Sequence, residues 1–572
     1  MKLTPRDVPP RAAWTLEQAG VHPLLARLYA ARGVTQAQEL DDQLAQLLPP
    51  RDLRGIDAAA DLLANAIERD LRLCIVADYD CDGATACAVA VRGLRLLGAR
   101  QVDYLVPDRA RDGYGLTPPI AQRVAQSGAE VLITVDNGIA SIEGVQTAKA
   151  LGLQVLVTDH HLCASANGAV TLPQADAIVN PNQPGCAFAS KSLAGVGVMF
   201  YVLLHLRAVL RDRGRFDAKT QPRLDALLPL VALGTVADVV KLDANNRRLV
   251  AQGLKRTRAG ALPPGMSALF NVAGREASKA SAQDFGFALG PRINAAGRLA
   301  DMGLGISCLL TDDSQQAVDL AQQLDAINRE RRNIEGDMLE QALATAESML
   351  DLDNDPPPAL CVFDPEFHEG VVGIVASRLK EKWHRPTFVL AMNSHDDDQL
   401  KGSGRSIPGF HLRDALDLLA KRHPGVLLKF GGHAMAAGCT IAADELDTFE
   451  QGLQAIAAEW LDADALTREL QVDGPLTPEL CTVETAELLQ TPVWGQGFAA
   501  PVFAQPMAIS AQRMVGSGHL QLKCMLGEQV IDGIWFGRTD PVPDGATLAF
   551  QLDINSFRGQ RKVQFVVQGM AD

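Results

Sequence analysis

Between residues 71 and 160, short apolar runs alternate with longer segments in which apolar residues recur every three or four positions. The apolar runs are LRLCIVAD (71–78), QVDYLVP (101–107), EVLITVD (130–136) and QVLVTD (154–159). The segment ATACAVAVRGLRLLGA, between the first two runs, has the periodicity of an amphipathic helix. Strands separated by helices of this length predict a parallel, doubly wound α/β sheet, with helical patterns continuing to about residue 310.

A single long helix is predicted over residues 313–350, which contain no proline and one glycine. Ala317, Leu320, Leu324 and Ile327 form one apolar stripe at steps of three or four. A continuous helix of this length spans about 57 Å at about 1.5 Å per residue. It stops at three prolines, 356–358. That length is typical of a strut between two lobes.

The C-terminal third predicts a second mixed α/β lobe followed by a small β-barrel. The barrel is indicated by short alternating strands, HLQLKCML, QVIDGIWF, ATLAFQLDI and RKVQFVVQG. Its aromatic residues fill the core more often than they stack on bases, so we favour core positions for Trp494, Phe498, Phe503, Trp535 and Phe536. The predicted segments are an N-terminal helical segment (1–50), a catalytic domain (51–312), a connecting helix (313–355), a second lobe (356–468) and the barrel (469–572).

Composition narrows the class of protein. No apolar run is long enough for a membrane helix and the start does not resemble a signal peptide, so we expect a cytoplasmic protein without membrane contacts. The ten cysteines include no CxxC pair, which indicates reduced thiols. A net charge of −15 argues against a protein that coats nucleic acid. Any DNA groove would therefore be a local basic stripe.

The motif DYDCDG at 78–83 is the first candidate for chemistry. Residues two apart in an extended chain point the same way, so Asp78, Asp80 and Asp82 are predicted to face one side of the strand end. Carboxylates this close repel one another unless cations lie between them. A solvated aspartate-rich turn explains this motif equally well by itself. An EF-hand does not fit, because a strand precedes the motif.

Two further strand ends carry the same types of side chain. Asp136 follows the third predicted strand, and Asp159, His160 and His161 follow the fourth. Open parallel sheets bind ligands beyond the carboxyl ends of their strands, so these groups are expected to share one crevice. Oxygen-rich ligation with one or two imidazoles favours Mn²⁺ or Mg²⁺ over structural zinc.

These motifs, together with GTVADVV (234–240), resemble the DHH phosphoesterase superfamily. GPRINAAGRL (290–299), HEGVVGIVASRL (368–379), KGSGRSIPGF (401–410) and GGHAMAAG (431–438) are similar to the RecJ exonuclease family within it. The resemblance covers roughly residues 70–440. It implies a DHH domain, a DHHA1 second lobe and an OB-like barrel, and hydrolysis of single-stranded DNA from the 5′ end to nucleoside 5′-monophosphates in repair and recombination.

The resemblance also implies roles for individual residues. Asp80 and Asp136 would hold one divalent ion, with Asp78 assisting because Val76 stands where a histidine is common. Asp82, Asp136, His160 and Asp238 would hold a second ion, and His161 would contact the scissile phosphate. Implied substrate contacts are Arg109, Arg292, Arg298, Ser403, Arg405 and His433. Each of these is more commonly a surface or turn residue when taken by itself.

Two alternatives stay open. A DHH enzyme acting on oligonucleotides or cyclic dinucleotides needs only two lobes, so the tail from 470 to 572 counts against it. A non-catalytic replication scaffold with the same fold would be expected to lose metal ligands, and this chain keeps the set together. Expected partners are single-stranded DNA, a single-stranded-DNA-binding protein and a helicase, and a monomer is expected. Polarity, strandedness and the preference for DNA rest on the resemblance.

Overall fold

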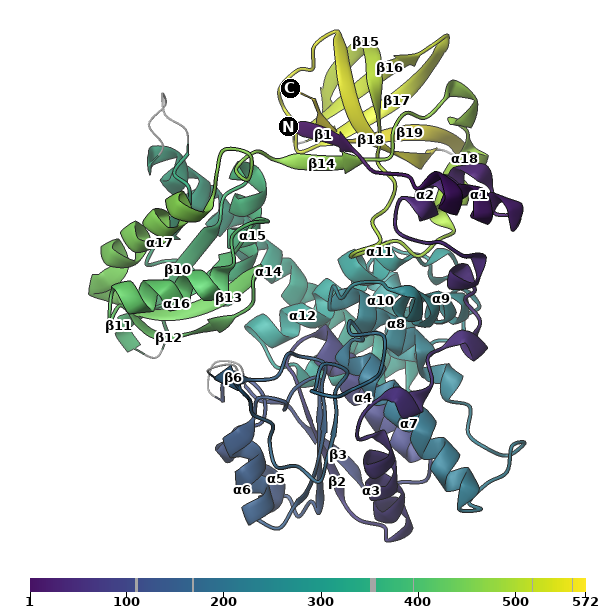
Figure 1. Ribbon diagram of the computed structural model, residues 1–572, viewed down its shortest axis with the longest axis vertical. Helices are drawn as coiled ribbons and strands as arrows, with labels where there is room; N and C mark the ends of the chain where they lie inside the picture. The colour runs from purple at the N-terminus through teal and green to yellow at the C-terminus, as the bar shows by residue number, and fades with distance from the viewer. Residues whose placement is uncertain are drawn as a thin grey trace.

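The computed structural model describes residues 1–108, 112–166, 169–349, 356–394, 396–516, 518–557 and 559–571. Figure 1 shows three bodies: an α/β body below, a second lobe at the left and a barrel above, near which both chain termini lie. No helix in these described ranges is long and apolar enough to cross a membrane.

The α/β body is built on a five-stranded sheet that is parallel throughout. Its strand order is β3-β2-β4-β5-β8. The strands are β2 (Leu73–Ala77), β3 (Val102–Leu105), β4 (Val131–Val135), β5 (Gln154–Thr158) and β8 (Ala177–Val179). Because the order reverses between β2 and β4, the crevice for a ligand lies beyond the carboxyl ends of these two strands.

Helices cover both faces of this sheet, which explains its uninterrupted apolar strands. Ile75 of β2 packs in the core shared with α3 (Ile56–Glu68), α4 (Cys81–Leu96) and α7 (Gly195–Asp212). Its neighbour Val76 faces the opposite core, shared with α5 (Pro118–Gln126) and α6 (Ile142–Ala150). The prediction of a doubly wound sheet is confirmed. A short antiparallel pair, β6 (Ser165–Ala166) and β7 (Ala169–Val170), follows β5.

A helical subregion extends the α/β body and leads into the second lobe. Its helices are α8 (Leu228–Ala237), α9 (Ala244–Arg258), α10 (Pro264–Val272), α11 (Ala282–Asp284), α12 (Gly290–Leu299) and α13 (Gly303–Leu310). The long helix α14 (Ser314–Met349) packs on α10 and α12 through one half and on the second lobe through the other. The predicted connecting helix is therefore present.

The second lobe has a mixed sheet of order β12-β13-β11-β10-β9, in which only the β9–β10 pairing is parallel. Its strands are β9 (Leu360–Phe363), β10 (Thr387–Asn393), β11 (Asp396–Arg405), β12 (Leu427–Gly432) and β13 (Ala436–Ala442). Its helices are α15 (Val372–Trp383), α16 (Leu412–Arg422) and α17 (Leu446–Trp460).

The C-terminal strands close into a barrel of order β15-β16-β17-β19-β18, as predicted. They are β15 (Phe503–Val515), β16 (His519–Leu526), β17 (Gln529–Phe536), β18 (Gly545–Phe557) and β19 (Gln560–Met570), preceded by α18 (Val483–Gln490). The sequence pattern missed β15, whose interior contains Pro506. Phe503 is fully buried in the barrel core, whereas Phe536 is 59% exposed on its surface.

The N-terminal segment is more than the predicted helical stretch. It begins with strand β1 (Lys2–Pro5), which pairs in parallel with β14 (Glu469–Val472). Helices α1 (Pro10–Gln18) and α2 (Pro23–Ala30) follow, and Leu24, Leu25 and Leu28 of α2 pack into the barrel core. Local periodicity does not reveal β1, because its strand partner in the described part of the chain, β14, lies more than 400 residues away along the sequence. A protein truncated before β14 would leave both β1 and α2 uncovered.

Candidate metal centre

The DYDCDG motif forms the connection between β2 and α4. Asp80 is the N-cap of α4, where its carboxylate accepts a hydrogen bond of 2.9 Å from the Gly83 amide. Gly83 is required for the tight turn, because an added Cβ would lie 2.4 Å from the Asp78 carbonyl oxygen. Asp82 lies in the first turn of α4, so the three carboxylates are gathered by a turn and not by strand alternation as predicted.

The amino end of α7 holds Asp82 in place. The two carboxylate oxygens of Asp82 accept hydrogen bonds from the Gly195 and Val196 amides at 2.7 and 2.9 Å. A negative charge is favourable at a helix N-terminus, where amides have no partner within the helix. Gly195 also lets β4 come close, because a Cβ there would lie 2.5 Å from Asp136 Oδ1.

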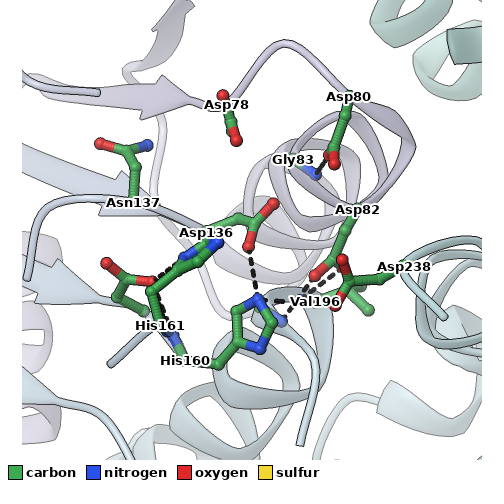
Figure 2. A network of polar contacts seen from close by, with 12 residues as sticks. Asp78, Asp80, Asp82, Gly83, Asp136, Asn137, His160, His161, Val196 and Asp238 are labelled. Carbon is green, nitrogen blue, oxygen red and sulfur yellow. Dashed lines mark hydrogen bonds and ion pairs between the residues drawn. The ribbon is translucent and has the colours of Figure 1, made fainter. Parts of the chain in front are cut away.

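Asp136, His160 and Asp238 point toward one another (Figure 2). Asp136 follows β4 with a φ of 62°, a left-handed conformation that is uncommon outside glycine. His160 Nε2 lies 3.1 Å from Asp136 Oδ1 and 3.5 Å from Asp238 Oδ2. Asp238 caps the carboxyl end of α8. His160 therefore belongs to two sets of side chains whose ligand atoms lie close enough to share a metal ion. The first set adds Asp136 and His161, and the second adds Asp82 and Asp238.

These three side chains have polar atoms without hydrogen-bond partners. Within the described part of the chain, Asp136 Oδ1, His160 Nε2 and Asp238 Oδ2 are buried and make no hydrogen bond. His160 does form a hydrogen bond with the backbone at Leu193, which must use Nδ1 because Nε2 has none. Such a bond orients an imidazole for ligation through the other nitrogen. A buried polar atom without a partner costs about 1–3 kcal/mol, and a cation among them removes that cost.

The pKa values of the four aspartates and of His160 also fit a metal site. Burial and neighbouring carboxylates raise the pKa of Asp136 and Asp238, and burial and Asp80 raise the pKa of Asp78. Burial, followed by Asp80, raises the pKa of Asp82 to about 7. Burial lowers the pKa of His160 to about 4, so its ring is neutral. Several carboxylates around a neutral imidazole fit divalent cations, which stabilise the ionised form of each group.

His161 differs from its neighbour in charge. Its Nδ1 lies 2.7 Å from Asp159 Oδ1. Burial opposes protonation, but this hydrogen bond and the charge of Asp159 raise the pKa of His161 to about 9. Asp159 also accepts hydrogen bonds from the backbone amides of His160, His161 and Ile139. The raised pKa favours the protonated form of His161 at neutral pH, in which its ring can donate a charge-assisted hydrogen bond.

Tyr114 and Asn294 are residues of the site that the sequence patterns did not identify. The Tyr114 hydroxyl lies 3.3 Å from His161 Nδ1, and the two rings meet edge to face. Asn294 of α12 accepts a hydrogen bond of 2.7 Å from the Cys81 amide, which ties α12 to the DYDCDG turn. The only sequence signal for Tyr114 was its place between two glycines after the second predicted strand.

Three of the predicted substrate contacts gather around the loop that leads into α15. Arg405 Nη1 donates to Ser403 Oγ at 3.1 Å on strand β11. A Cβ on Gly373 would lie 2.9 Å from both Ser403 Oγ and Arg405 Nη2. From the α/β body, Arg298 Nη1 reaches the Gly370 carbonyl oxygen at 3.3 Å. The two lobes thus bring these residues together.

The remaining predicted contacts lie elsewhere. Partial burial and the charge of His161 lower the pKa of His433, which places this second-lobe imidazole within electrostatic range of the cluster. Arg292 is 7% exposed and binds Asp325 of α14 at 2.8 Å and the Ala288 carbonyl oxygen at 2.6 Å. Its guanidinium joins two helices, so we no longer assign it to the substrate. Arg109 lies outside the described residues.

Comparison with known proteins places this site in a family. Models of the DHH family N-terminal domain, the DHHA1 domain and the RecJ OB domain match residues 72–235, 357–459 and 472–569. The chain is 48% identical over 562 residues to the single-stranded-DNA-specific exonuclease RecJ of Escherichia coli K12, with 96% of both chains covered. It is 32% identical to RecJ of Bacillus subtilis 168, covering 97% of this chain and 69% of that relative.

Solved structures give the same result. The crystal structure of RecJ from Thermus thermophilus in complex with Mn²⁺ superimposes with a TM-score of 0.82 at 30% identity. The match covers 100% of this chain and 79% of that one. With three matching domains in order and identity of this extent along nearly the whole chain, the protein belongs to the RecJ family of exonucleases, within the DHH superfamily.

Proposed function

We propose that this chain is a metal-dependent exonuclease that hydrolyses single-stranded DNA from the 5′ end and releases nucleoside 5′-monophosphates. The observation that carries the proposal is the set of buried, unpartnered atoms on Asp136, His160 and Asp238, within the described part of a chain of the RecJ family. Such a set suits a hydrolytic metal centre and has no evident purpose in a scaffold protein.

The residues present fit two divalent ions, Mn²⁺ or Mg²⁺. Asp80 and Asp136, with Asp78, would hold the first, and these three lie within ligand reach of one another. Asp82, His160 and Asp238 would hold the second, with Asp136 shared between both ions. When bound, two such ions activate a water and stabilise the leaving oxygen of an in-line displacement. Carboxylate and imidazole ligands of this kind favour Mn²⁺ or Mg²⁺.

The protein itself supplies orientation and charge around that centre. His161, protonated through its bond to Asp159, donates to a phosphate oxygen whose negative charge grows during hydrolysis. Asp159 keeps the ring in place because three backbone amides fix its own carboxylate. His433 lies between β12 and β13 of the second lobe, within electrostatic range of His161, and we expect a strand held between the lobes to meet both imidazoles.

Digestion of end-labelled DNA tests the proposal. With Mn²⁺ or Mg²⁺, a 5′-labelled single strand should release labelled mononucleotide from the first turnover, while a 3′-labelled strand shortens progressively. EDTA should stop both reactions, and duplex DNA should be resistant. Preference for a dinucleotide over a long strand would favour the oligonucleotide phosphodiesterase alternative. Complete inactivity of metal-loaded, folded protein would favour the scaffold.

Metal removal should make stability depend on pH. The raised pKa values of Asp78, Asp82, Asp136 and Asp238 mean that the folded protein without metal keeps protons that the unfolded chain releases. The free energy of unfolding should therefore fall as pH rises from about 4 to about 7. His160, with its pKa lowered to about 4, opposes this trend, but it is one group against four.

Calorimetric melting in EDTA and in Mn²⁺ at pH 5 and pH 7.5 measures this effect. Because Mn²⁺ replaces the protons, the rise in Tm caused by Mn²⁺ should be larger at pH 7.5 than at pH 5. An equal rise at both pH values would show that the four carboxyls are not the groups that bind the ion.

The loop before α15 is the candidate pocket for the 5′-terminal phosphate. A terminal phosphate carries more charge than an internal diester and suits an arginine fork with a hydroxyl donor. Arg405 and Ser403 contribute from β11 and Arg298 from the α/β body. We therefore expect Arg405→Ala to slow digestion of 5′-phosphorylated strands by about 10- to 150-fold, the effect of losing about 1.5–3 kcal/mol.

A two-by-two comparison of kcat/KM separates this role from a general one. A 5′-hydroxyl strand already lacks the phosphate, so Arg405→Ala should slow its digestion much less. The matched control is Arg422→Ala, which removes an exposed arginine of the same lobe that binds Glu459. An equal loss on both substrates would mean that Arg405 does not recognise the terminal phosphate.

We extend the proposal to the cellular setting. A single-strand exonuclease in repair and recombination needs strands opened by a helicase and covered by a single-stranded-DNA-binding protein, and both are proposed partners. A cytoplasmic location is proposed with them. The barrel, with Phe536 exposed, is the proposed additional contact for a long strand.

A further inference from the structure

A turn from the C-terminal part of the chain docks beside a proposed metal ligand. Beyond α18, Gly495 and Phe498 pair backbone to backbone, with hydrogen bonds of 3.0 Å in both directions. At the tip of this turn, the Gln496 carbonyl oxygen accepts a hydrogen bond of 2.8 Å from the Leu242 amide of the α/β body. In Figure 1 the chain next to α18 descends from the barrel to the helices of that body.

The fit between turn and body leaves no room for side chains on the two glycines. A Cβ on Gly495 would lie 2.6 Å from Leu242 Cδ1, and one on Gly497 would lie 2.5 Å from Lys241 Cγ. Gly497 also has a φ of 69°, which a residue with a side chain adopts only with strain. The turn is therefore shaped to lie against Lys241 and Leu242.

These two residues belong to the short link between Asp238 and helix α9. The link begins at Asp238, passes through Val239 with a φ of 61°, and ends at Asp243, the N-cap of α9. Only three residues, 239–241, separate Asp238 from Leu242. The short link, with one residue in the left-handed region, therefore ties the backbone position of Asp238 closely to that of Leu242.

Arg247 contacts the link and the turn at once. Its Nη1 donates to the Leu242 carbonyl oxygen at 3.0 Å. Its guanidinium carbon lies 4.1 Å from the centre of the Phe498 ring, a cation–π contact. Leu242 is consequently held at both backbone polar groups, by Gln496 through its amide and by Arg247 through its carbonyl.

The turn is itself anchored to the N-terminal segment and the barrel. Phe498, only 2% exposed, stacks on Trp494 with ring centres 5.2 Å apart and on Tyr29 of α2 at 6.0 Å. Arg32 lies over Trp494 and binds Asp473, which is next to β14, at 2.8 Å. The turn is thus part of a packed contact among the N-terminal segment, the barrel and the α/β body.

From this arrangement we propose that Phe498 and Arg247 are positioning residues for Asp238, so that docking of the C-terminal part sets the affinity of the second metal site. The inference rests on the proposed function, since it takes Asp238 to be a ligand. Asp238 has a buried oxygen with no hydrogen-bond partner in the described part of the chain, so its placement depends on its backbone. Supporting contacts of this kind fix the geometry that a ligand needs.

Calorimetric titration of Mn²⁺ into the full-length protein without DNA tests the proposal. Phe498→Leu and Arg247→Lys should each raise the dissociation constant for one of the two Mn²⁺ ions by about 3- to 30-fold. Loss of a residue that contacts a metal ligand directly typically weakens metal binding by about 10- to 100-fold. The binding step of the other ion should be unchanged. Saturating Mn²⁺ should restore kcat, and KM for a short oligonucleotide should stay at the wild-type value.

Phe503→Leu is the matched control, because Phe503 is equally buried in the same C-terminal part but packs inside the barrel. It should lower Tm and leave both metal steps unchanged. Unchanged metal steps in Phe498→Leu and Arg247→Lys, or an equal change in Phe503→Leu, would overturn the proposal. If Phe498→Leu does not fold, Arg247→Lys decides alone.

Asp238→Asn separates failure of this inference from failure of the ligand assignment. It should abolish one of the two metal steps. If Asp238→Asn titrates like the wild type, the assignment of Asp238 as a ligand is wrong. If it loses the step while Phe498→Leu and Arg247→Lys do not weaken it, only the positioning role is wrong.

Discussion

Asp136→Asn should abolish hydrolysis of single-stranded DNA while the protein stays folded. Among the described residues, Asp136 groups with Asp78 and Asp80 on one side and lies 3.1 Å from His160 on the other, so its loss should weaken both proposed metal sites at once. Each ion contributes several kcal/mol to stabilising charge in the transition state, so we expect kcat/KM to fall by about 10³-fold or more. Asparagine is preferable to alanine, because Asp136 has a φ of 62° and asparagine tolerates this conformation.

Stability should change little or rise in the protein without metal. Burial and the neighbouring carboxylates raise the pKa of Asp136, which means that its ionised form is costly when no cation is bound. The measurements are kcat/KM over a range of Mn²⁺ concentrations and Tm in EDTA. Asp103→Asn, which changes an exposed carboxylate of the neighbouring strand β3, is the matched control and should retain wild-type activity. Wild-type activity of Asp136→Asn at low Mn²⁺ would refute the shared-ligand assignment.

The adjacent histidines should respond in opposite ways to replacement by alanine. His160, neutral and with a free Nε2 between Asp136 and Asp238, is proposed as a ligand. His160→Ala should weaken Mn²⁺ binding by about 10- to 100-fold, and excess Mn²⁺ should partly restore the rate. His161, charged through Asp159, is proposed as a phosphate contact. His161→Ala should lower kcat by about 10²- to 10³-fold with little change in metal affinity.

Mn²⁺ calorimetry and rates at saturating Mn²⁺ distinguish the two roles. His519→Ala, in the barrel, controls for the loss of an imidazole remote from the site. The reverse pattern, with metal affinity lost in His161→Ala and retained in His160→Ala, would exchange the two assignments. A parallel loss in both would indicate that the pair acts as one unit through their adjacent backbone.

Much of the fold, and the meeting of several candidate metal ligands, followed from local patterns. Apolar runs and helical spacing were enough to predict the parallel sheet, the long helix and the barrel. The positions of Asp80, Asp136 and His160 followed as well, because parallel strands bring their carboxyl ends to one edge whatever the loops do. Arg298, Ser403 and Arg405 came from motif resemblance, and the structure brings them together around one loop.

Contacts between distant segments decided the rest. Asp238 ends a helix, where its sequence alone favours a cap, and it reaches the cluster because α8 packs against α4. That packing depends on Gly234, where a Cβ would lie 2.1 Å from Thr85 Oγ1. Arg292 was a candidate substrate contact by motif, and a buried partner on α14 accounts for it instead.

The sequence by itself therefore determined the first four strands of the parallel sheet in the α/β body, where each ends and which polar groups follow it, because these depend on residues close along the chain. The tertiary structure alone decided that β1 pairs with β14, that Tyr114 meets His161, and that the turn at Gly495 lies against Leu242. Hydrophobic periodicity reports which face of an element is buried but not which distant element covers it. Contacts of this second kind depend on shape and hydrogen bonding between segments that are 47 to several hundred residues apart, and they form only once the chain has folded.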